Sequence, residues 1–342
     1  MEGSHPYSRL TPDTVLNALE ALGLRCDGRL LALNSYENRV YQVGLEDPLP
    51  GAPPAPRPAV VAKFYRPERW TNEQILEEHA FALELAAAEI PVVAPLVLAG
   101  ATLHEREGFR FAVFPRRGGR APDLEDEKTL EWLGRFIGRI HGVGRAHAFA
   151  HRPRLDIAGF GEEPRAFLLA NDFIPPDLLA AWKQVVDLAL EGVRHAFARA
   201  GDFAWIRTHG DCHPSNVLWT PDTGNAPGGP HFVDLDDSRM APAVQDLWML
   251  VSGDRHSMGR QLRRLLEGYE DFREFDDREL HLVEALRTLR LIHYSAWLAR
   301  RWDDPAFPIA FPWFDTPRYW QDRILELREQ VAALQEPPPV PE

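Results

Sequence analysis

The chain has 342 residues, of which 45% are hydrophobic and 26% are charged, the composition of a globular protein with room for two lobes or domains. Its 51 acidic and 38 basic side chains give a formal net charge of −13, which argues against a nucleic-acid backbone or an anionic membrane surface as the main partner. The most apolar stretch, residues 85–103, is interrupted by Glu89, Pro91 and Pro95, so we expect no membrane span.

Two features indicate the cellular compartment. The chain has two cysteines, Cys26 and Cys212, which are far apart in sequence and are typical of reduced thiols rather than of a disulfide scaffold. The first 14 residues lack the apolar core of a signal peptide. We therefore expect a cytoplasmic protein, and we expect it to be a monomer.

The first 115 residues have the pattern of a mostly antiparallel sheet with two helices. Thr11 and Pro12 precede the first helical pattern as an N-cap and a first-turn proline, and Asn72 is the candidate N-cap of the second. Helices are expected at 13–24 and 73–89, and strands at 29–34, 39–45, 59–65, 92–99 and 109–115.

The composition changes at 115–123, where arginine, glycine and proline cluster, and we interpret this segment as a hinge. Helical patterns follow at 127–144, 178–200, 259–272, 277–302 and 317–334, and a shorter one at 243–253. The expected fold class is α+β with two lobes. The N-terminal lobe spans 1–115, the C-terminal lobe 116–336, and a proline-rich tail, 337–342, is expected to be disordered.

The stretch 209-HGDCHPSN-216 places Asp211 five residues before Asn216, the spacing used for phosphoryl transfer. An aspartate in this position orients an attacking hydroxyl and accepts its proton, and the asparagine offers an amide oxygen to Mg²⁺. Asp234, at the end of an expected strand, would supply a carboxylate to the same metal. A hairpin of 217–220 and 231–234 would bring it back to the loop.

A lysine and its partner complete this pattern upstream. Lys63, in 60-VVAKF-64, has the position of a strand lysine that contacts nucleotide phosphates. Such a lysine needs a carboxylate from the nearby helix, and Glu78 is our choice, with Glu77 next and Glu84 the third candidate. Adjacent helical positions point about 100° apart, so only one of Glu77 and Glu78 can face Lys63.

These segments, together with 33-LNSYENRVYQV-43 and 233-VDLDDSRMAPAVQDLWML-250, resemble the bacterial stress response kinase A group, also called YihE or RdoA. That group belongs to the aminoglycoside-phosphotransferase and choline-kinase-like branch of the protein kinase fold. The resemblance extends from about residue 8 to 330, except for the loops near 50 and 225. It implies a two-lobed protein-kinase-like fold, with a small antiparallel-sheet lobe and a mainly helical lobe.

The resemblance also implies an ATP- and Mg²⁺-dependent serine/threonine protein kinase of the cytoplasm that acts in stress response. The catalytic base would be Asp211, the metal ligands Asn216 and Asp234, and Ser35 would sit at the nucleotide phosphates. Asp234 would thus be both a catalytic and a metal-binding residue. ATP would lie with its adenine at the hinge and its phosphates at the turn 35–38.

Two departures from ordinary protein kinases are visible. No G-x-G-x-x-G is present, so the Ser35 hydroxyl and the backbone N–H groups of 35-SYEN-38 would have to cover the phosphates. No A-P-E or long activation segment follows Asp234, so we expect no control by activation-loop phosphorylation. The short segment also leaves no obvious platform for a peptide substrate.

Plainer interpretations exist for several residues. Asp211 and Asn216 alone are compatible with a solvated turn, and His209, Asp211 and His213 could be a zinc cluster. Asp246 either hydrogen-bonds the catalytic loop, as in the resembled group, or is a first-turn helix acid. Roles for Asp236, Asp237 and Cys212 stay open, His141 is expected to be a packed or capping residue, and the aromatic stretch 307–314 is either packing or part of an acceptor groove.

The sequence therefore predicts a kinase with ATP and Mg²⁺ as cofactors and a protein serine or threonine hydroxyl as acceptor. One alternative is a small-molecule kinase of the aminoglycoside, choline or homoserine type, which would use the same machinery on a small alcohol. A second alternative is a nucleotide-binding scaffold without turnover. The sequence identifies neither the protein targets nor the stress signal.

Overall fold

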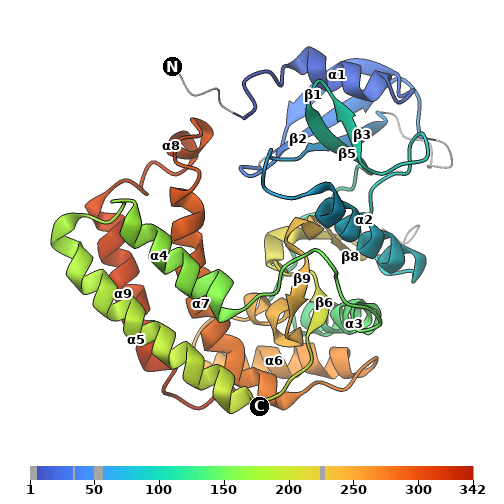
Figure 1. Cartoon of the computed structure of the whole chain (residues 1–342). Helices are drawn as coiled ribbons and strands as arrows, with labels where there is room; N and C mark the ends of the chain where they lie inside the picture. The colour runs from blue at the N-terminus through green and yellow to red at the C-terminus, as the bar shows by residue number, and fades with distance from the viewer. Residues whose placement is uncertain (1–5, 34, 50–56, 224–227, 342) are drawn as a thin grey trace. The chain divides into compact units, whose positions relative to one another are not determined.

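The computed structural model describes residues 6–33, 35–49, 57–223 and 228–341 (Figure 1). The chain divides into two compact units, the first made of Met1–Arg120 and Leu218–Asp236, the second of Ala121–Val217 and Asp237–Glu342. The expected α+β class is confirmed, with an N-terminal antiparallel sheet and a helical C-terminal part. The predicted lobe boundary at residue 115 stays a prediction.

A five-stranded antiparallel sheet with the order β1-β2-β3-β5-β4 forms the centre of the first unit. Its strands are β1 (Cys26–Ala32), β2 (Arg39–Leu45), β3 (Ala59–Phe64), β4 (His104–Arg106) and β5 (Phe109–Pro115). Within β3, Lys63 pairs with Val40 of β2 and with Ala112 of β5. The backbone of Lys63 is therefore held by a strand on each side.

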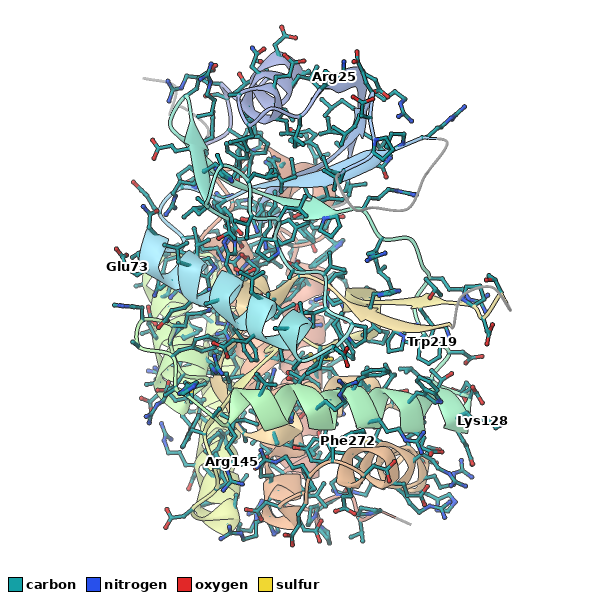
Figure 2. The ribbon with its side chains drawn as sticks, turned by 90° about the vertical axis from the view of Figure 1, so that its right-hand side faces the viewer. Arg25, Glu73, Lys128, Arg145, Trp219 and Phe272 are labelled. Atoms are coloured by element: carbon teal, nitrogen blue, oxygen red, sulfur yellow. The ribbon has the colours of Figure 1, made fainter. Side chains whose placement is uncertain are left out.

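Two helices belong to the first unit. The N-cap of α1 (Pro12–Glu20) is Thr11, as expected, and this helix packs Val15 and Leu19 into the core of the sheet. The N-cap of α2 (Asn72–Ala87) is Thr71 and not Asn72, because Thr71 and Gln74 form a reciprocal capping box that Asn72 cannot make. In Figure 2, Glu73 marks the first turn of α2.

The strand expected at 92–99 was wrong. Within these described residues the backbone makes two isolated bridges, Val92 with Phe232 and Leu98 with Ala101, and no strand. The apolar run suited a strand, but prolines at 91 and 95 have no N–H to donate to a neighbouring strand.

Helices make up most of the second unit. They are α3 (Glu127–Gly144), α4 (Glu163–Ala170), α5 (Pro176–Ala200), α6 (Arg255–Glu270), α7 (Val283–Ala299), α8 (Ala306–Ala310) and α9 (Pro317–Ala333). A short antiparallel pair, β6 (Ile206–Thr208) and β9 (Arg239–Ala241), lies among them. The hairpin of β7 (Val217–Thr220) and β8 (Gly229–Phe232) belongs to the first unit apart from Val217.

Glycines allow α3 and α6 to pack closely. A Cβ at Gly134 of α3 would lie 1.9 Å from the carbonyl oxygen of Leu265, and one at Gly268 of α6 would lie 1.9 Å from that of Glu131. Figure 2 labels Lys128 and Arg145 near the two ends of α3, and Phe272, which follows α6. This helix pair carries His141 and Tyr269, which support the loop 209–216 described below.

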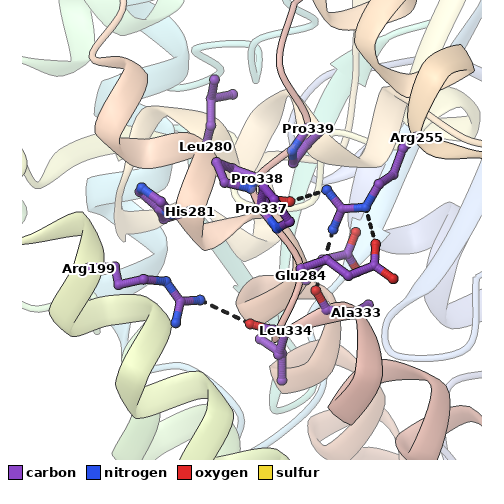
Figure 3. A pocket seen from close by; sticks show the side chains of 11 residues that line it. Arg199, Arg255, Leu280, His281, Glu284, Ala333, Leu334, Pro337, Pro338 and Pro339 are labelled. Atoms are coloured by element: carbon purple, nitrogen blue, oxygen red, sulfur yellow. Dashed lines mark hydrogen bonds and ion pairs between the residues drawn. The ribbon is translucent and has the colours of Figure 1, made fainter.

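Residues 337–341, the described part of the tail, contact the second unit, and the disorder expected for the tail stays a prediction. Arg255 of α6 forms an ion pair with Glu336 and donates to the carbonyl oxygen of Pro337, and Pro339 is buried. These residues line a small pocket that Arg199, Leu280 and Glu284 also border (Figure 3). A polyproline segment needs no hydrogen bonds of its own, so it can pack in this way without secondary structure.

Among the described helices, none is long and apolar enough to cross a membrane.

Candidate active site

Lys63 is the centre of a buried ion-pair cluster in the first unit. Its Nζ lies 3.0 Å from Oδ1 of Asp234, 3.1 Å from Oδ1 of Asp236 and 3.9 Å from Oε1 of Glu78. Burial alone would lower the pKa of Lys63, but the three carboxylates outweigh it and raise the pKa well above its ordinary value. The lysine is therefore positively charged at any physiological pH.

The partner of Lys63 comes from α2, as the sequence predicts. Glu78 is buried on the face of α2 that also carries Ile75, Ala82 and Leu85. Intervals of three, four and seven residues place these side chains on one face of the helix. Among the described residues, Glu78 is the one of the three candidate acids that forms an ion pair with Lys63. The structure thus brings Lys63 and Glu78 together.

Asp234 and Asp236 have different environments although one residue separates them. Asp234 follows β8 with φ = +58°, a left-handed conformation that is uncommon outside glycine, and its side chain is 53% exposed. Asp236 is 4% exposed in its side chain, and Arg69 and Asn38 also contact it. Of the two, Asp234 has the carboxylate that a cation from solvent can reach.

The turn between β1 and β2 carries Ser35, which is half-buried. The following residues are fixed by contacts to the segment after β3. Glu37 lies 3.8 Å from Nε of Arg66 and 3.8 Å from Nε of Arg69, and Oδ1 of Asn38 accepts from the backbone N–H of Arg66 at 3.0 Å. Position 34, beside Ser35, lies outside the described residues.

Asp211 lies in the second unit, in the loop after β6. Nη1 of Arg290, on α7, is 2.5 Å from its Oδ1, and Nε2 of His213 is 3.4 Å from its Oδ2. Burial would raise the pKa of Asp211, but the hydrogen bond from His213 and the charge of Arg290 together lower it. Asp211 is therefore ionised at neutral pH, as a group that accepts a proton must be.

Asn216 ends the short helix η2 (Pro214–Asn216) of the same loop. Its Nδ2 donates to the backbone oxygen of Asp211 at 2.9 Å. The amide orientation is set by this bond, so the amide oxygen is the atom that Asn216 can offer to a hard cation. The structure thus brings Asp211 and Asn216 together in one loop, at the spacing that the sequence shows.

Asp246 hydrogen-bonds the backbone of the loop 209–216, and this resolves the choice left open by the sequence. Its Oδ2 accepts from the backbone N–H of His209 at 2.7 Å, and its Oδ1 from that of Gly210 at 2.8 Å. Nε2 of His141, on α3, lies 3.0 Å from Oδ2, and both side chains are buried. Gly210 has φ = +85°, and a Cβ there would lie 2.1 Å from the carbonyl oxygen of Asp237, so only glycine fits.

The helix expected at 243–253 is instead two turns of 3-10 helix, η4 (Ala243–Asp246) and η5 (Trp248–Leu250). The break leaves Asp246 at the end of the first turn with its carboxylate directed at the backbone of 209–210. His141 is a packed residue, as expected, and it also bridges Asp246 and the hydroxyl of Tyr269.

The zinc interpretation of His209 and His213 receives no support. Over the described ranges, no group of three or more His, Cys, Asp or Glu side chains is arranged to hold a metal ion. His209 is buried, and its Nδ1 accepts from the backbone N–H of Asp211 at 3.4 Å. Its role in the structure is to shape the loop.

Sequence reasoning missed two sets of residues. Arg290 gave no signal, because it is one arginine in a long helical pattern, about 80 positions from the loop it contacts. Arg66 and Arg69 stand in the quoted segment 61-VAKFYRPERW-70, but their partners in the turn 35–38 could not be assigned from spacing alone.

Comparisons of this chain with known proteins agree on one family. The sequence model of the phosphotransferase enzyme family (APH) matches residues 29–283. Stress response kinase A of Escherichia coli K12 is 46% identical over 332 residues, covering 97% of this chain and 96% of that protein. The serine/threonine protein kinase RdoA of Salmonella typhimurium is 44% identical over 337 residues, covering 98% and 97%.

Solved structures share the fold at lower identity. The amicoumacin kinase hAmiN, in complex with AMP-PNP, Ca²⁺ and Ami, has a TM-score of 0.70 at 18% identity and covers 96% of this chain and 95% of that one. A microcompartment-associated aminopropanol kinase has a TM-score of 0.67 at 16% identity, covering 94% and 96%. The fold, the full-length relatives and the two pairs Lys63–Glu78 and Asp211–Asn216 lead to one conclusion: this chain belongs to the phosphotransferase enzyme family and, within it, to the stress response kinase A group.

Proposed function

We propose that this chain is an ATP- and Mg²⁺-dependent kinase that transfers the γ-phosphoryl group to a serine or threonine hydroxyl of a protein, as part of a stress response. Family membership and the name of the Salmonella relative support the acceptor class. The observation that carries the proposal furthest is Asp211, which is ionised, held by Arg290 and His213, and joined to Asn216.

The residues of the first unit serve nucleotide binding in this proposal. Lys63 would direct its charge at the phosphates of ATP, and Glu78 would orient the ammonium group. The hydroxyl of Ser35 and the N–H groups of the turn 35–38 would donate to phosphate oxygens in place of a glycine-rich loop. Each of these roles requires a hydrogen-bond donor or charge held in a fixed position, and the burial of Lys63 and Glu37 supports such rigidity.

Asp211 would act on the acceptor. Its carboxylate orients the hydroxyl and accepts its proton while the oxygen bonds to the γ-phosphorus and the bond from that phosphorus to the bridging oxygen of ADP breaks. A lowered pKa makes Asp211 a weak base, so the proton moves late in the reaction. Orientation is then its larger contribution.

Asn216 and Asp234 each carry an oxygen donor of the kind that a hard divalent cation prefers. Asn216 has its amide nitrogen committed to Asp211, which leaves the oxygen as donor, and Asp234 has a half-exposed carboxylate. When bound, Mg²⁺ neutralises charge on the β- and γ-phosphates. In the first unit, Asp234 lies near the positive charge of Lys63 and the negative charge of Asp236, so the charges around its carboxylate partly cancel.

A small-molecule acceptor is the second candidate function. Two structural relatives are described as an amicoumacin kinase and an aminopropanol kinase, which act on small molecules by name. The same chemistry of Asp211 would serve a small alcohol. A scaffold that binds nucleotide without turnover is the third candidate, and the complete set of Lys63, Glu78, Asp211, Asn216 and Asp234 argues against it.

The experiment incubates the purified chain with γ-labelled ATP and Mg²⁺, once with a generic protein acceptor and once with a panel of amino alcohols and aminoglycosides. We expect label on serine or threonine of the protein or of the kinase itself, and loss of that label in a Lys63→Met variant. Label only on a small alcohol would replace the proposal by the second candidate. ATP binding without any transfer would replace it by the third.

Cellular location and assembly belong to the proposal as well. We propose that the protein acts as a monomer in the cytoplasm, with no nucleic acid or membrane as partner, in line with its net charge of −13. Size-exclusion chromatography with light scattering measures the mass in solution; we expect the mass of one chain, and the mass of a dimer would contradict the proposal.

A further inference from the structure

Asp236 has no role assigned so far, yet it is one of the most enclosed charged groups of the first unit. It lies in the turn η3 (Leu235–Asp237) after β8. Its Oδ1 is 3.1 Å from Nζ of Lys63, and its Oδ2 accepts from Nδ2 of Asn38 at 3.2 Å and from Nη1 of Arg69. One carboxylate therefore joins β3, the turn 35–38 and the segment before α2.

These contacts make Asp236 unsuited to bind a metal. Both of its oxygens already face N–H groups or an ammonium group, and its side chain is 4% exposed. A cation would have to displace Lys63 or Arg69 to reach it, at the cost of burying that charge unpaired. Asp234, two residues before, has the exposure that Asp236 lacks.

Arg69 extends the network to the turn that would cover the phosphates. Its Nε lies 3.8 Å from Glu37, while its Nη1 donates to Asp236, so one guanidinium group spans both carboxylates. Arg66 adds a second cation at 3.8 Å from Glu37. The turn 35-SYEN-38 has no glycine, so buried side-chain contacts, rather than backbone freedom, set its conformation.

The enclosed charges of this cluster balance, and the half-exposed Asp234 adds one further carboxylate beside Lys63. Three buried or nearly buried cations, Lys63, Arg66 and Arg69, face three buried carboxylates, Glu37, Glu78 and Asp236. Loss of one member leaves a buried charge without its counterpart, which costs more than the net contribution of the pair. Without Asp236, Lys63 would keep Asp234 as its closest carboxylate, at 3.0 Å, and would compete with a cation for it.

We propose that Asp236 is a positioning residue that fixes Lys63 and, through Asn38 and Arg69, the turn 35–38 in the arrangement that receives the phosphates of ATP. The proposal rests on the proposed function, because it assumes that Lys63 and this turn bind nucleotide. It assigns to the network of Asp236, Arg69 and Glu37 the task that glycine-rich sequence performs in other kinases.

The test uses Asp236→Asn and Arg69→Lys in the full-length chain. Asn keeps the shape of Asp236 without its charge. Lys keeps the charge of Arg69 but replaces its planar fork, in which Nε and Nη1 face different carboxylates, by a single nitrogen. The matched control is Asp27→Asn, which removes an exposed aspartate that pairs with Arg29 on β1 of the same unit. Direct titration with ATP and Mg²⁺ gives Kd, steady-state kinetics separate KM for ATP from kcat, and thermal unfolding monitors the fold.

We expect a Kd and a KM for ATP that rise by about tenfold or more in both variants, since one lost charged contact amounts to about one order of magnitude in affinity. The control should stay within about twofold of the wild type, as a surface pair contributes little. In both variants kcat at saturating ATP should fall less than the affinity, because Asp236 and Arg69 act on the residues that receive the phosphates and not on the acceptor hydroxyl. Loss of folded protein alone would lower the apparent kcat and leave KM for ATP unchanged.

Unchanged ATP affinity in folded Asp236→Asn and Arg69→Lys would overturn the inference. If Asp236→Asn does not fold, Arg69→Lys and Asn38→Ala decide in its place. If the wild type itself binds no ATP, the proposed function fails, and the inference, which rests on it, fails with it.

Discussion

The contact between Asp246 and the loop 209–216 allows a prediction of a change in stability whose size follows from the structure. The buried carboxylate accepts three hydrogen bonds: from the N–H groups of His209 and Gly210, and from Nε2 of His141. Asp246→Asn retains one acceptor oxygen. With that oxygen in the Oδ2 position, the bonds from His209 and His141 survive, and the new NH₂ group faces the N–H of Gly210, donor against donor.

The free energy of unfolding should therefore fall by about 2–3 kcal/mol in Asp246→Asn, from one buried donor without an acceptor and the loss of charge assistance. Asp246→Ala loses all three bonds and should lose roughly 3–5 kcal/mol, the range for breaking a buried charged network. The opposite amide orientation loses two bonds and is less stable, so the smaller figure holds for Asn.

Urea unfolding at pH 7, followed by circular dichroism, measures both variants. Asp322→Asn is the control, because it removes an aspartate from an exposed i,i+4 pair with Arg318 on α9 and should change the free energy by less than about 1 kcal/mol. Phosphoryl transfer should fall in both Asp246 variants as the loop 209–216 loses its support. An Asn variant within about 0.5 kcal/mol of the wild type would refute the idea that Asp246 holds the loop.

Three further predictions concern single positions. Arg290→Ala removes a cation that lowers the pKa of Asp211, so the acidic limb of the pH–rate profile should move to higher pH, whereas Arg318→Ala should leave it in place; an unmoved limb in Arg290→Ala would count against Asp211 as the titrating group. Burial raises the pKa of Glu279 to about 7, so the folded state binds this proton more tightly than the unfolded state, and stability should fall as pH rises from about 4.5 to 7. Glu279→Gln should flatten that slope in urea unfolding at pH 5 and pH 8, and equal slopes would contradict the assignment. Gly134→Ala should lose about 1–3 kcal/mol because its Cβ would meet the carbonyl oxygen of Leu265, whereas Gly142→Ala, in the same helix with open space around it, should lose nothing; equal effects would refute close packing of α3 on α6.

Local sequence signals predicted the elements that carry the site. The apolar strand around Lys63, the helical spacing that turns Glu78 inward and the loop spacing of Asp211 and Asn216 depend on residues within a few positions of each other. The fold class and the family followed from them and were confirmed.

Contacts between distant segments were beyond prediction. Arg290 reaches Asp211 from α7, and Arg69 reaches Asp236 over 167 positions. The position of an arginine within a helix or a loop does not predict which carboxylate its side chain will contact. Local rules also gave wrong elements where two signals competed, as at 92–99, where apolar character favoured a strand and two prolines prevented one.

The central claim is that Asp211 acts on the acceptor hydroxyl, and a variant of this residue tests it most directly. Transfer from γ-labelled ATP to a protein acceptor should be compared between the wild type and Asp211→Asn, at ATP concentrations that saturate each. We expect the transfer rate to fall by about 10²–10⁴-fold, the usual contribution of a positioned acid–base group, while ATP affinity stays within a few-fold of the wild type. A variant that transfers phosphate at the wild-type rate would contradict the account.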